Sequence, residues 1–389
     1  PTASGFSSNI WRLNVDLNLR QYAGNVRFDY GIFGRLKRLG YDMDEEFLGL
    51  SSDDFSQFIL GAHFETSLPV GDHFNISPGA AITAFPGEFP VSLEPRMRFS
   101  WQPFGSDNQE LSGAAGFYRQ SVVGISDMRD ASSVFVAWMN APINNAQMEA
   151  IHTTLGWQQL LTDGLTWSLE GYYKRLSNQP VPVWNTIARF TTELALANGQ
   201  VFGGDLRLEY QQGPFYGMVG YGYSWTKYKS AQESFSEWFG QPVQEYHPPH
   251  DRRHQLNALF SLELGTYTAG VRWQLGSGVP FTRPIGFDDL LDFRERLPDV
   301  KRDQGLRRVI LDKPYQGRLP TVHRLDVSLE RSFRFTSGLM LNARVGAVNL
   351  YDQRNLFFYD VFTHRRVDQL PLVPYLTLEM EIGKKRSGE

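Results

Sequence analysis

The sequence predicts an all-β fold: a transmembrane, antiparallel, up-and-down β-barrel with about fifteen visible strands, forming one domain over residues 1–389. Three observations predict it. Apolar and polar residues alternate with a period of two, tight and long connections alternate along the chain, and aromatic residues make up 14% of the composition. Strands with one apolar and one polar face, repeated along a whole chain, are typical of barrels that cross an outer membrane.

The alternation is clear near the start of the chain. From Trp11 to Leu19, apolar side chains stand at every second position, with Arg, Asn and Asp between them. Because successive side chains of a strand point to opposite faces, this segment has one apolar and one charged face. The same pattern recurs at residues 205–210, 267–275, 324–333 and 372–382.

Most of the predicted strands have roughly 10 to 13 residues, the length of a tilted strand that crosses a bilayer. They are expected to begin near Asn9, Asn25, Ser56, Phe74, Val91, Glu110, Ala150, Leu165, Val201, Phe215, His254, Tyr267, His323, Leu339 and Leu372. Tight links are expected at 22–24, 70–73, 105–108, 162–164, 213–214, 265–266 and 336–338. Long links are expected at 40–55, 124–148, 180–200, 230–253 and 278–322, with a short helical turn near 288–296.

A soluble stack of β-sheets also alternates, and it is the competing interpretation. Its strands average about 5 to 6 residues, roughly half the length predicted here. The strand around Leu325 favours the membrane-barrel interpretation over the soluble one. A register slip of one residue there would turn Arg324 and Asp326 toward lipid, and a basic residue costs roughly 2 to 4 kcal/mol at mid-depth. The polar face is therefore expected to line a lumen.

Composition and motifs exclude several classes of function. The net charge of −4 gives no basic face for nucleic acid, and the absence of cysteine excludes disulfides and thiolate metal sites. No apolar run approaches the roughly 20 residues of a transmembrane helix. No lipase, zinc-protease, phosphate-loop or dinucleotide motif is present, so we expect neither an enzyme nor a cofactor.

The strand count leads to an expectation about completeness. With the tight turns in the periplasm, the last strand leaves the C-terminus there, whereas the first strand begins outside. A single-chain barrel normally has an even number of strands. We therefore expect that upstream strands are missing from this sequence, unless one strand is miscounted.

Three late motifs carry a family resemblance. HPPHDRRHQLNALFSLEL from His247, GRLPTVHRLDVSLERSFRF from Gly317 and NARVGAVNLYDQRNLFFYD from Asn342 resemble the C-terminal strands of TonB-dependent outer-membrane receptors, and the tail from Val367 is similar to their closing strand. The resemblance implies the C-terminal portion of a 22-stranded, plugged barrel that imports a scarce, nutrient-type solute. It also implies contact with outer-membrane lipid, with a TonB complex through the plug, and with a surface lipoprotein lid.

Two departures from the family keep other functions open. No plug or TonB-binding segment precedes Trp11, and the chain ends in KKRSGE rather than on an aromatic residue. A passive, porin-like channel of roughly 16 strands is one alternative. A surface binding or structural protein anchored by its barrel is the other.

The candidate site residues fall into three groups. Aromatic residues in the long links could stack on a ligand: Trp138, Trp184, Trp238, Phe239 and Tyr246. They could equally pack loop against loop. Lumenal charges could guide a solute, dock a plug or pair across strands: Arg12, Asp16, Arg96, Arg98, Asp205, Arg207, Glu209, Arg272, Arg324, Asp326, Glu330 and Arg344. We expect no metal site, with His247, His250 and His254 as the weak candidates, because their spacing also suits a loop-to-strand boundary.

Overall fold

The computed structural model describes residues 6–45, 49–86, 89–105, 108–125, 136–140, 146–184, 193–291, 298–299, 301–302, 305–336, 339–360 and 365–382. In this part, one sheet follows the chain through β1 (Phe6–Ala23), β2 (Val26–Glu45), β3 (Gly49–Val70), β4 (Phe74–Phe85), β5 (Phe89–Trp101), β6 (Gln109–Gln120), β9 (Met148–Thr162), β10 (Leu165–Pro182), β11 (Leu194–Gln212), β12 (Phe215–Ala231), β14 (His254–Leu264), β15 (Tyr267–Gly276), β20 (Val322–Thr336), β21 (Leu339–Val348) and β24 (Val373–Ile382). Each strand pairs antiparallel with the next. The predicted all-β, up-and-down architecture is confirmed.

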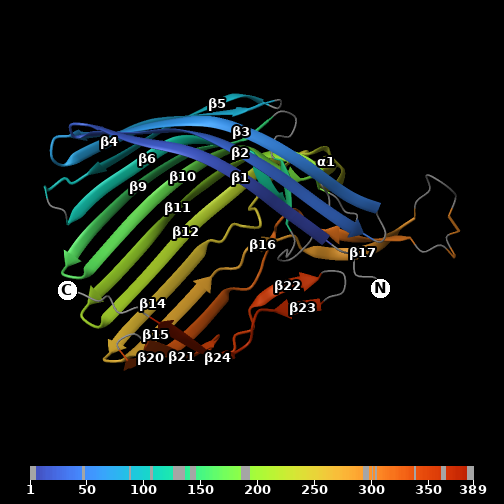
Figure 1. Ribbon diagram of the computed structural model, residues 1–389. Coiled ribbons are helices and arrows are strands. Elements are labelled where there is room, and N and C mark those ends of the chain that lie inside the picture. Colours follow the sequence, from blue (N-terminus) through green and yellow to red (C-terminus); the bar gives the residue numbers. More distant parts are fainter. Residues whose placement is uncertain are drawn as a thin grey trace.

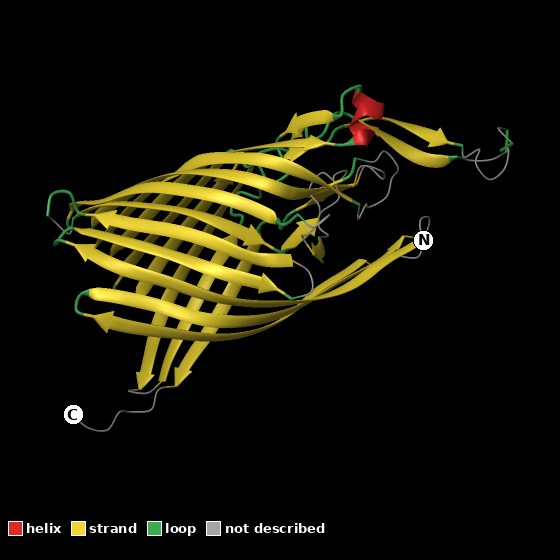
Figure 2. Ribbon diagram, turned by 90° about the horizontal axis from the view of Figure 1, so that it is seen from above, coloured by secondary structure: helices red, strands yellow, loops and turns green. Residues whose placement is uncertain are grey.

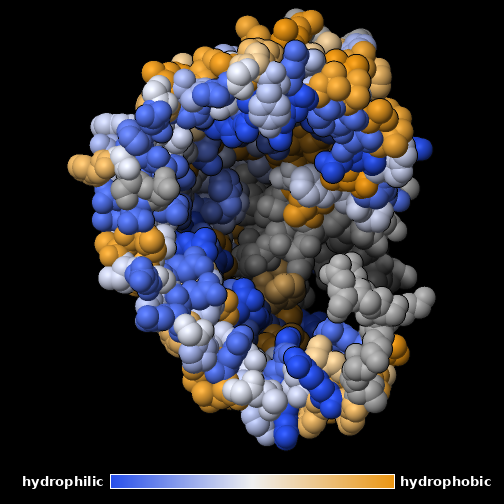
Figure 3. Space-filling view, turned by 60° about the vertical axis from the view of Figure 1, so that its left-hand side comes forward, coloured by the Kyte–Doolittle hydropathy of each residue, from blue (hydrophilic) through white to orange (hydrophobic). Residues whose placement is uncertain are grey.

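The sheet curls around a hollow rather than lying flat. In Figure 1 the blue strands β1 to β3 form one wall, and the yellow to red strands β14 to β24 form another. From above, strands of the front wall cross over strands of the rear wall (Figure 2). The space-filling view shows a central opening whose rim and visible interior are largely hydrophilic, with apolar side chains toward the outside (Figure 3). The sheet therefore has a convex, outward face and a concave, inward face.

The outward face is apolar because the strand register aligns every second residue. One row across the first strands runs through Leu17, Ile32, Ala62, Ile82 and Leu93. Leu17, Ile32 and Ile82 are 54%, 60% and 49% exposed, although large aliphatic side chains are normally buried in soluble proteins. A continuous exposed apolar belt marks a surface that meets lipid or another protein.

The first strands are longer than the sequence predicted. β1, β2 and β3 have 18, 20 and 22 residues, and β9 to β12 have 15 to 19, so the expected length of 10 to 13 residues is wrong for these strands. It is correct for β4, β5, β6, β14, β15, β21 and β24. The predicted long link at 40–55 is largely a ribbon, because pairing continues from Gly40↔Asp54 to Glu45↔Gly49. Continued pairing satisfies backbone N–H and C=O groups beyond the apolar belt. Composition alone does not reveal this, because the Gly, Asp, Glu and Ser residues of the segment are typical of a loop.

The tight links match their predicted positions. Glycines with φ between 54° and 86° occur in the links after β1, β3, β5, β9, β11 and β14. This left-handed backbone is costly for residues that carry a Cβ, so glycine permits the reversal between long strands. Residues 337–338 of the last predicted tight link lie outside the described residues.

The long connections contain small elements of their own. Two-stranded ribbons form between β7 (Val122–Ile125) and β8 (Ala137–Asn140), β16 (Pro280–Phe281) and β19 (Gly317–Arg318), β17 (Pro284–Leu290) and β18 (Leu306–Leu311), and β22 (Leu356–Asp360) and β23 (Arg365–Asp368). β13 (Val243–Tyr246) pairs with the end of β12.

The described part of the chain has one helix, α1 (Glu233–Phe239), which ends at Gly240 with φ 72°. The helical turn predicted near 288–296 is wrong over residues 288–290, because they belong to β17; residues 292–297 lie outside the described part. Among the described residues, no helix is long and apolar enough to cross a membrane.

Candidate functional site: the concave wall

The concave face carries the predicted lumenal charges, mostly as ion pairs. Glu330 on β20 accepts a hydrogen bond from Arg344 Nε on β21 at 2.6 Å. Arg98 on β5 likewise pairs with Glu65 on β3, two strands away. Other pairs join neighbours on one face of one strand: Arg96–Glu94 at 3.7 Å, Arg207–Glu209 at 2.5 Å and Arg324–Asp326 at 2.9 Å. Pairing of opposite charges on one face stabilises a sheet, so these residues have a structural role whatever else they do.

Four of the predicted charges, Arg12, Asp16, Asp205 and Arg272, are exposed and form no ion pair within the described part of the chain. Arg12 and Asp16 lie on β1, whereas Asp205 and Arg272 lie near each other on the opposite wall. The latter two line a pocket of about 570 Å³ on the wall formed by β10 to β15, together with Tyr172, Arg207 and Asn257. The wall therefore presents both signs of charge and amide and phenol groups around one hollow.

A glycine leaves the room that this pocket needs. Gly222 on β12 is the register partner of Asp205, and a Cβ on Gly222 would lie 2.7 Å from Asp205 Oδ1. Across the pocket, Gln274 Nε2 donates a hydrogen bond to Asn257 Oδ1 at 3.2 Å. Tyr172, Asn257 and Gly222 were not among the residues predicted from the sequence. The alternation does place all three on the polar face, but it does not show which residues of distant strands meet.

The three histidines have separate partners, and the ring of His250 packs edge-on against Tyr228 with centroids 5.8 Å apart. His247 Nδ1 donates to the carbonyl of Thr226 at 2.5 Å, which leaves Nε2 to accept from Arg253 Nη2 at 3.1 Å. His254 Nδ1 lies 2.7 Å from the Tyr221 hydroxyl. Among the described residues, no group of three His, Cys, Asp or Glu side chains is arranged to hold a metal ion. Both ring nitrogens of His247 are engaged, so the histidine spacing reflects a loop-to-strand boundary.

Asp251 is the centre of a hydrogen-bond network. Its side chain is fully buried, and Oδ1 accepts from the Thr226 backbone N–H at 2.7 Å. Oδ2 accepts from Arg253 Nε at 2.7 Å and from Arg318 Nη2 at 2.5 Å. Burial alone would raise the pKa of this carboxyl, but the hydrogen bonds from Arg253 and Arg318 hold it below its ordinary value. Asp251 is therefore a charged anchor between two of the resemblance motifs.

The aromatic candidates separate into buried and exposed residues. Trp184 is 2% exposed and packs edge-on against Phe239, with ring centroids 5.2 Å apart. It belongs to a core with Phe235, Val309 and Leu311 that joins three long connections. The ligand interpretation is therefore wrong for Trp184 in this conformation, because a ligand cannot reach a buried ring. Partly buried Phe239 is explained by the same packing.

A second small core contains Tyr246. This residue packs with Val181, Ala197 and Tyr228, and its burial raises the pKa of the phenol well above the usual value. The prediction that Tyr246 contacts a ligand is therefore replaced by a packing role. Trp138 and Trp238 are each 38% exposed, so ligand contact stays a prediction for these two residues.

Comparison with solved structures connects this geometry to known folds. The iron transporter FrpB of Neisseria meningitidis matches 96% of this chain at 14% identity with a TM-score of 0.59. The ferric yersiniabactin uptake receptor FyuA of Yersinia pestis matches 97% at 12% identity with a TM-score of 0.60. The outer-membrane transporter YddB of Escherichia coli matches 97% at 8% identity with a TM-score of 0.56. The fold is that of an outer-membrane transporter barrel.

The resemblance to TonB-dependent receptors drawn from the late motifs is thus confirmed at the level of the fold. The chain spans about half the length of these transporters, namely 55%, 54% and 54% of the three chains. No family model matches the sequence, and no curated protein matches it significantly. The structural neighbours are transporters and receptors rather than enzymes.

Proposed function

We propose that this chain forms the barrel portion of a TonB-dependent outer-membrane receptor that takes up a nutrient-type solute. The observation that carries the proposal is the two-faced wall. An exposed apolar belt covers the convex face, while Asp205, Arg207 and Arg272 surround a hollow on the concave face. Lipid is the environment in which such an outward belt is stable, and a charged inner wall suits a polar cargo.

A metal chelate is the cargo class that we propose. The supporting argument is that FrpB and FyuA are named for iron and ferric yersiniabactin, and that the copper transporter OprC shares the fold at 14% identity and a TM-score of 0.60. Arginines on the inner wall would suit the carboxylate or phenolate groups of a chelator, because guanidinium groups bind planar anions strongly.

Three partners follow from this proposal. Outer-membrane lipid would contact the apolar belt, with the C-terminus in the periplasm. A TonB complex would act through a plug, and a surface lipoprotein could cover the long connections. Tests of these partners require the whole protein, because this chain is proposed to form only part of it.

The test is uptake by cells that express the whole protein in place of their own receptors. We expect accumulation of a radiolabelled iron or copper chelate that disappears when TonB is deleted. Replacing Arg207 and Arg272 by Gln should lower uptake without lowering the amount of folded protein in the outer membrane. Uptake that persists without TonB, or steady ion conductance in planar bilayers, would contradict the proposal in favour of a passive channel.

A further inference from the structure

A polar pocket lies on the outward face of β10 to β13, where the apolar belt ends. The register places Tyr173, Phe202 and Trp225 in one outward row, and the rings of Phe202 and Trp225 stack with centroids 4.8 Å apart. Gly171 and Gly204 occupy the next row toward the tight turns, and Leu169 and Leu206 occupy the row after that. These two leucines point outward and are 49% and 43% exposed. An aromatic row at the edge of an aliphatic belt marks the membrane–water interface.

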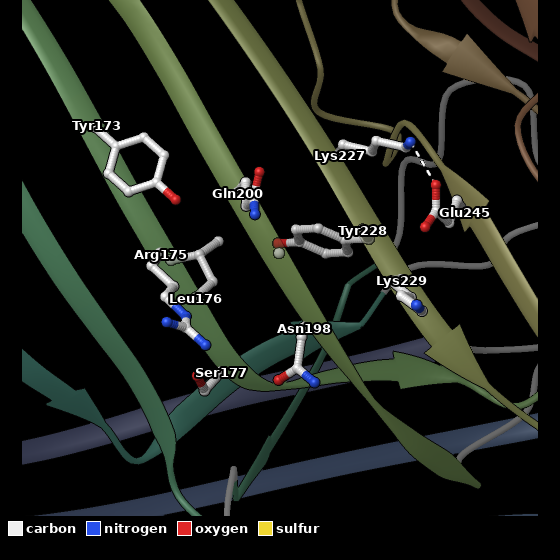
Figure 4. A pocket seen from close by; sticks show the side chains of 11 residues that line it. Tyr173, Arg175, Leu176, Ser177, Asn198, Gln200, Lys227, Tyr228, Lys229 and Glu245 are labelled. Carbon is white, nitrogen blue, oxygen red and sulfur yellow. Dashed lines mark ion pairs between the residues drawn. The ribbon is translucent and has the colours of Figure 1, made fainter.

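The next rows toward the long connections change abruptly from apolar to basic. Arg175, Gln200 and Lys227 align in the first row, and Asn198, Lys229 and Glu245 align in the second. These side chains surround a pocket of about 370 Å³. Figure 4 shows them arriving from neighbouring strands, with the ion pair between Lys227 and Glu245 drawn as a dashed line.

The charges of this pocket do not cancel. Lys227 Nζ lies 2.5 Å from Glu245 Oε2, so one cation is paired. Arg175 and Lys229 are exposed, and within the described residues neither forms an ion pair. The pocket therefore carries an excess of two positive charges beside the amide donors of Gln200 and Asn198.

Two other outward arginines on the side of the long connections are neutralised. Arg38 on β2 pairs with Asp54 on β3, and Arg119 on β6 pairs with Glu149 on β9 at 2.8 Å. Glu149 is the nearest register neighbour of the pocket on the β9 side, opposite Ser177, but it is already engaged by Arg119. The unbalanced charge of this pocket thus contrasts with these two paired sites.

We propose that this pocket binds the phosphate groups of an anionic membrane lipid in the leaflet on the side of the long connections. Guanidinium and ammonium groups form charge-assisted hydrogen bonds with phosphate oxygens, and the amides supply further donors. The aromatic and aliphatic rows directly below would contact the acyl chains of the same molecule. This continuity favours a lipid over a free anion, and it rests on the membrane placement in the proposed function.

The experiment measures lipid binding to the whole protein in detergent micelles by native mass spectrometry. The probes are a bis-phosphorylated glycolipid, the same lipid after removal of its phosphates, and inorganic phosphate. The test variant is R175Q/K229Q. The matched control is K174Q, because Lys174 is the neighbour of Arg175 on the same strand but on the concave face. Heat-modifiable migration in gels first establishes that each variant is a folded barrel.

We expect the double variant to bind the phosphorylated lipid about 25-fold more weakly than the wild type. This estimate takes roughly a fivefold effect for each basic residue near an anionic lipid surface. K174Q should bind like the wild type, and the dephosphorylated lipid should bind the wild type as weakly as the phosphorylated lipid binds the double variant. Equal affinities of wild type and double variant, or equal affinities for the two lipids, would overturn the proposal. Displacement of the lipid by millimolar inorganic phosphate would overturn the choice of lipid over a free anion.

Failure of this proposal is distinguishable from failure of the proposed function. A protein that folds as a barrel in micelles and takes up chelate, but shows no phosphate-dependent lipid binding, refutes only the lipid site. A protein without uptake that still discriminates the two lipids refutes only the transport proposal.

Discussion

Asp251, directly before the strand β14, accepts a hydrogen bond from Arg318 of β19 across 67 residues of chain, with Oδ2 and Nη2 2.5 Å apart. Arg318 also donates from Nη1 to the carbonyls of Asp251 and Gly278, at 3.1 and 3.0 Å. One guanidinium on β19 thereby joins the segment before β14 to Gly278, which lies between β15 and β16. A buried carboxylate with two arginine partners holds together the end of the barrel from which the long connections emerge.

Replacing Asp251 by Asn should destabilise this end of the barrel. The substitution keeps the shape but removes the charge that Arg253 and Arg318 bind, and breaking a buried pair costs about 3 kcal/mol or more. The measurement is the free energy of unfolding in urea with the barrel in lipid vesicles. The control is E245Q, which breaks the exposed pair with Lys227 and should cost less than about 1 kcal/mol. Equal losses for D251N and E245Q would contradict this role of Asp251.

The contribution of Asp251 should vanish in acid. Its pKa in the folded protein lies below the ordinary value of 3.8, because the hydrogen bonds from the two arginines outweigh the effect of burial. A depressed pKa stabilises the fold above the unfolded-state pKa, and the stabilisation is lost as pH falls through the folded-state pKa. The stability difference between wild type and D251N should stay constant from about pH 8 to pH 5 and shrink below about pH 4. A difference that grows in acid would contradict the assignment.

The strands could be predicted because their signal is local. Residues 11–19 already show which side chains face outward, and the structure confirms an exposed Trp11 and Leu13 in β1. Helix α1 gave no such signal, because its seven residues make only two turns. The ribbon that extends β2 and β3 was not predicted because its Gly, Asp, Glu and Ser residues are typical of a loop.

The site was harder to predict because it depends on contacts between distant segments. The sequence places Asp205 and Arg272 on the polar face, but only the register across β11 to β15 shows that they share one pocket. Trp184 shows a second difficulty. The sequence does not reveal whether a tryptophan in a long connection is exposed or buried, and the burial of Trp184 depends on its contacts with Phe235 and Val309.

Replacing Asn349 by alanine should lower the stability of the fold more than replacing it by glycine. Its backbone has φ 55°, its side chain is fully buried, Nδ2 donates to the carbonyls of Gln353 and Leu370, and Oδ1 accepts from the Gln353 N–H. N349A loses these bonds and also strains the left-handed backbone by about 1 to 2 kcal/mol. N349G loses the bonds alone. We therefore expect N349A to unfold at a lower urea concentration than N349G, and the reverse order would exclude backbone strain.

Trp184 and Trp238 should respond differently to alanine. W184A leaves a cavity between Phe235 and Phe239 and should cost about 3 to 5 kcal/mol, which protease cleavage of the long connections would report. W238A removes a ring that is 38% exposed, so it should cost clearly less than W184A. If W238A nonetheless lowers uptake, Trp238 contacts the cargo. Resistance of W184A to protease equal to that of the wild type would contradict the packing role.

Two neighbouring residues of β20 offer the most direct test of the membrane-facing surface. Leu329 lies in an outward row with Ala269, Val345 and Leu376 and is 44% exposed, whereas Ser328 points inward opposite Gly270 and Gly346. L329R places a charge in the apolar belt and should lower the free energy of folding into lipid vesicles by about 2 to 4 kcal/mol. S328R puts the same charge on the concave wall, where Gly270 leaves space beside Ser328 and water solvates the charge, so its cost should be small. Equal destabilisation by both variants, or a larger loss for S328R, would mean that the Leu and Val rows face something other than lipid.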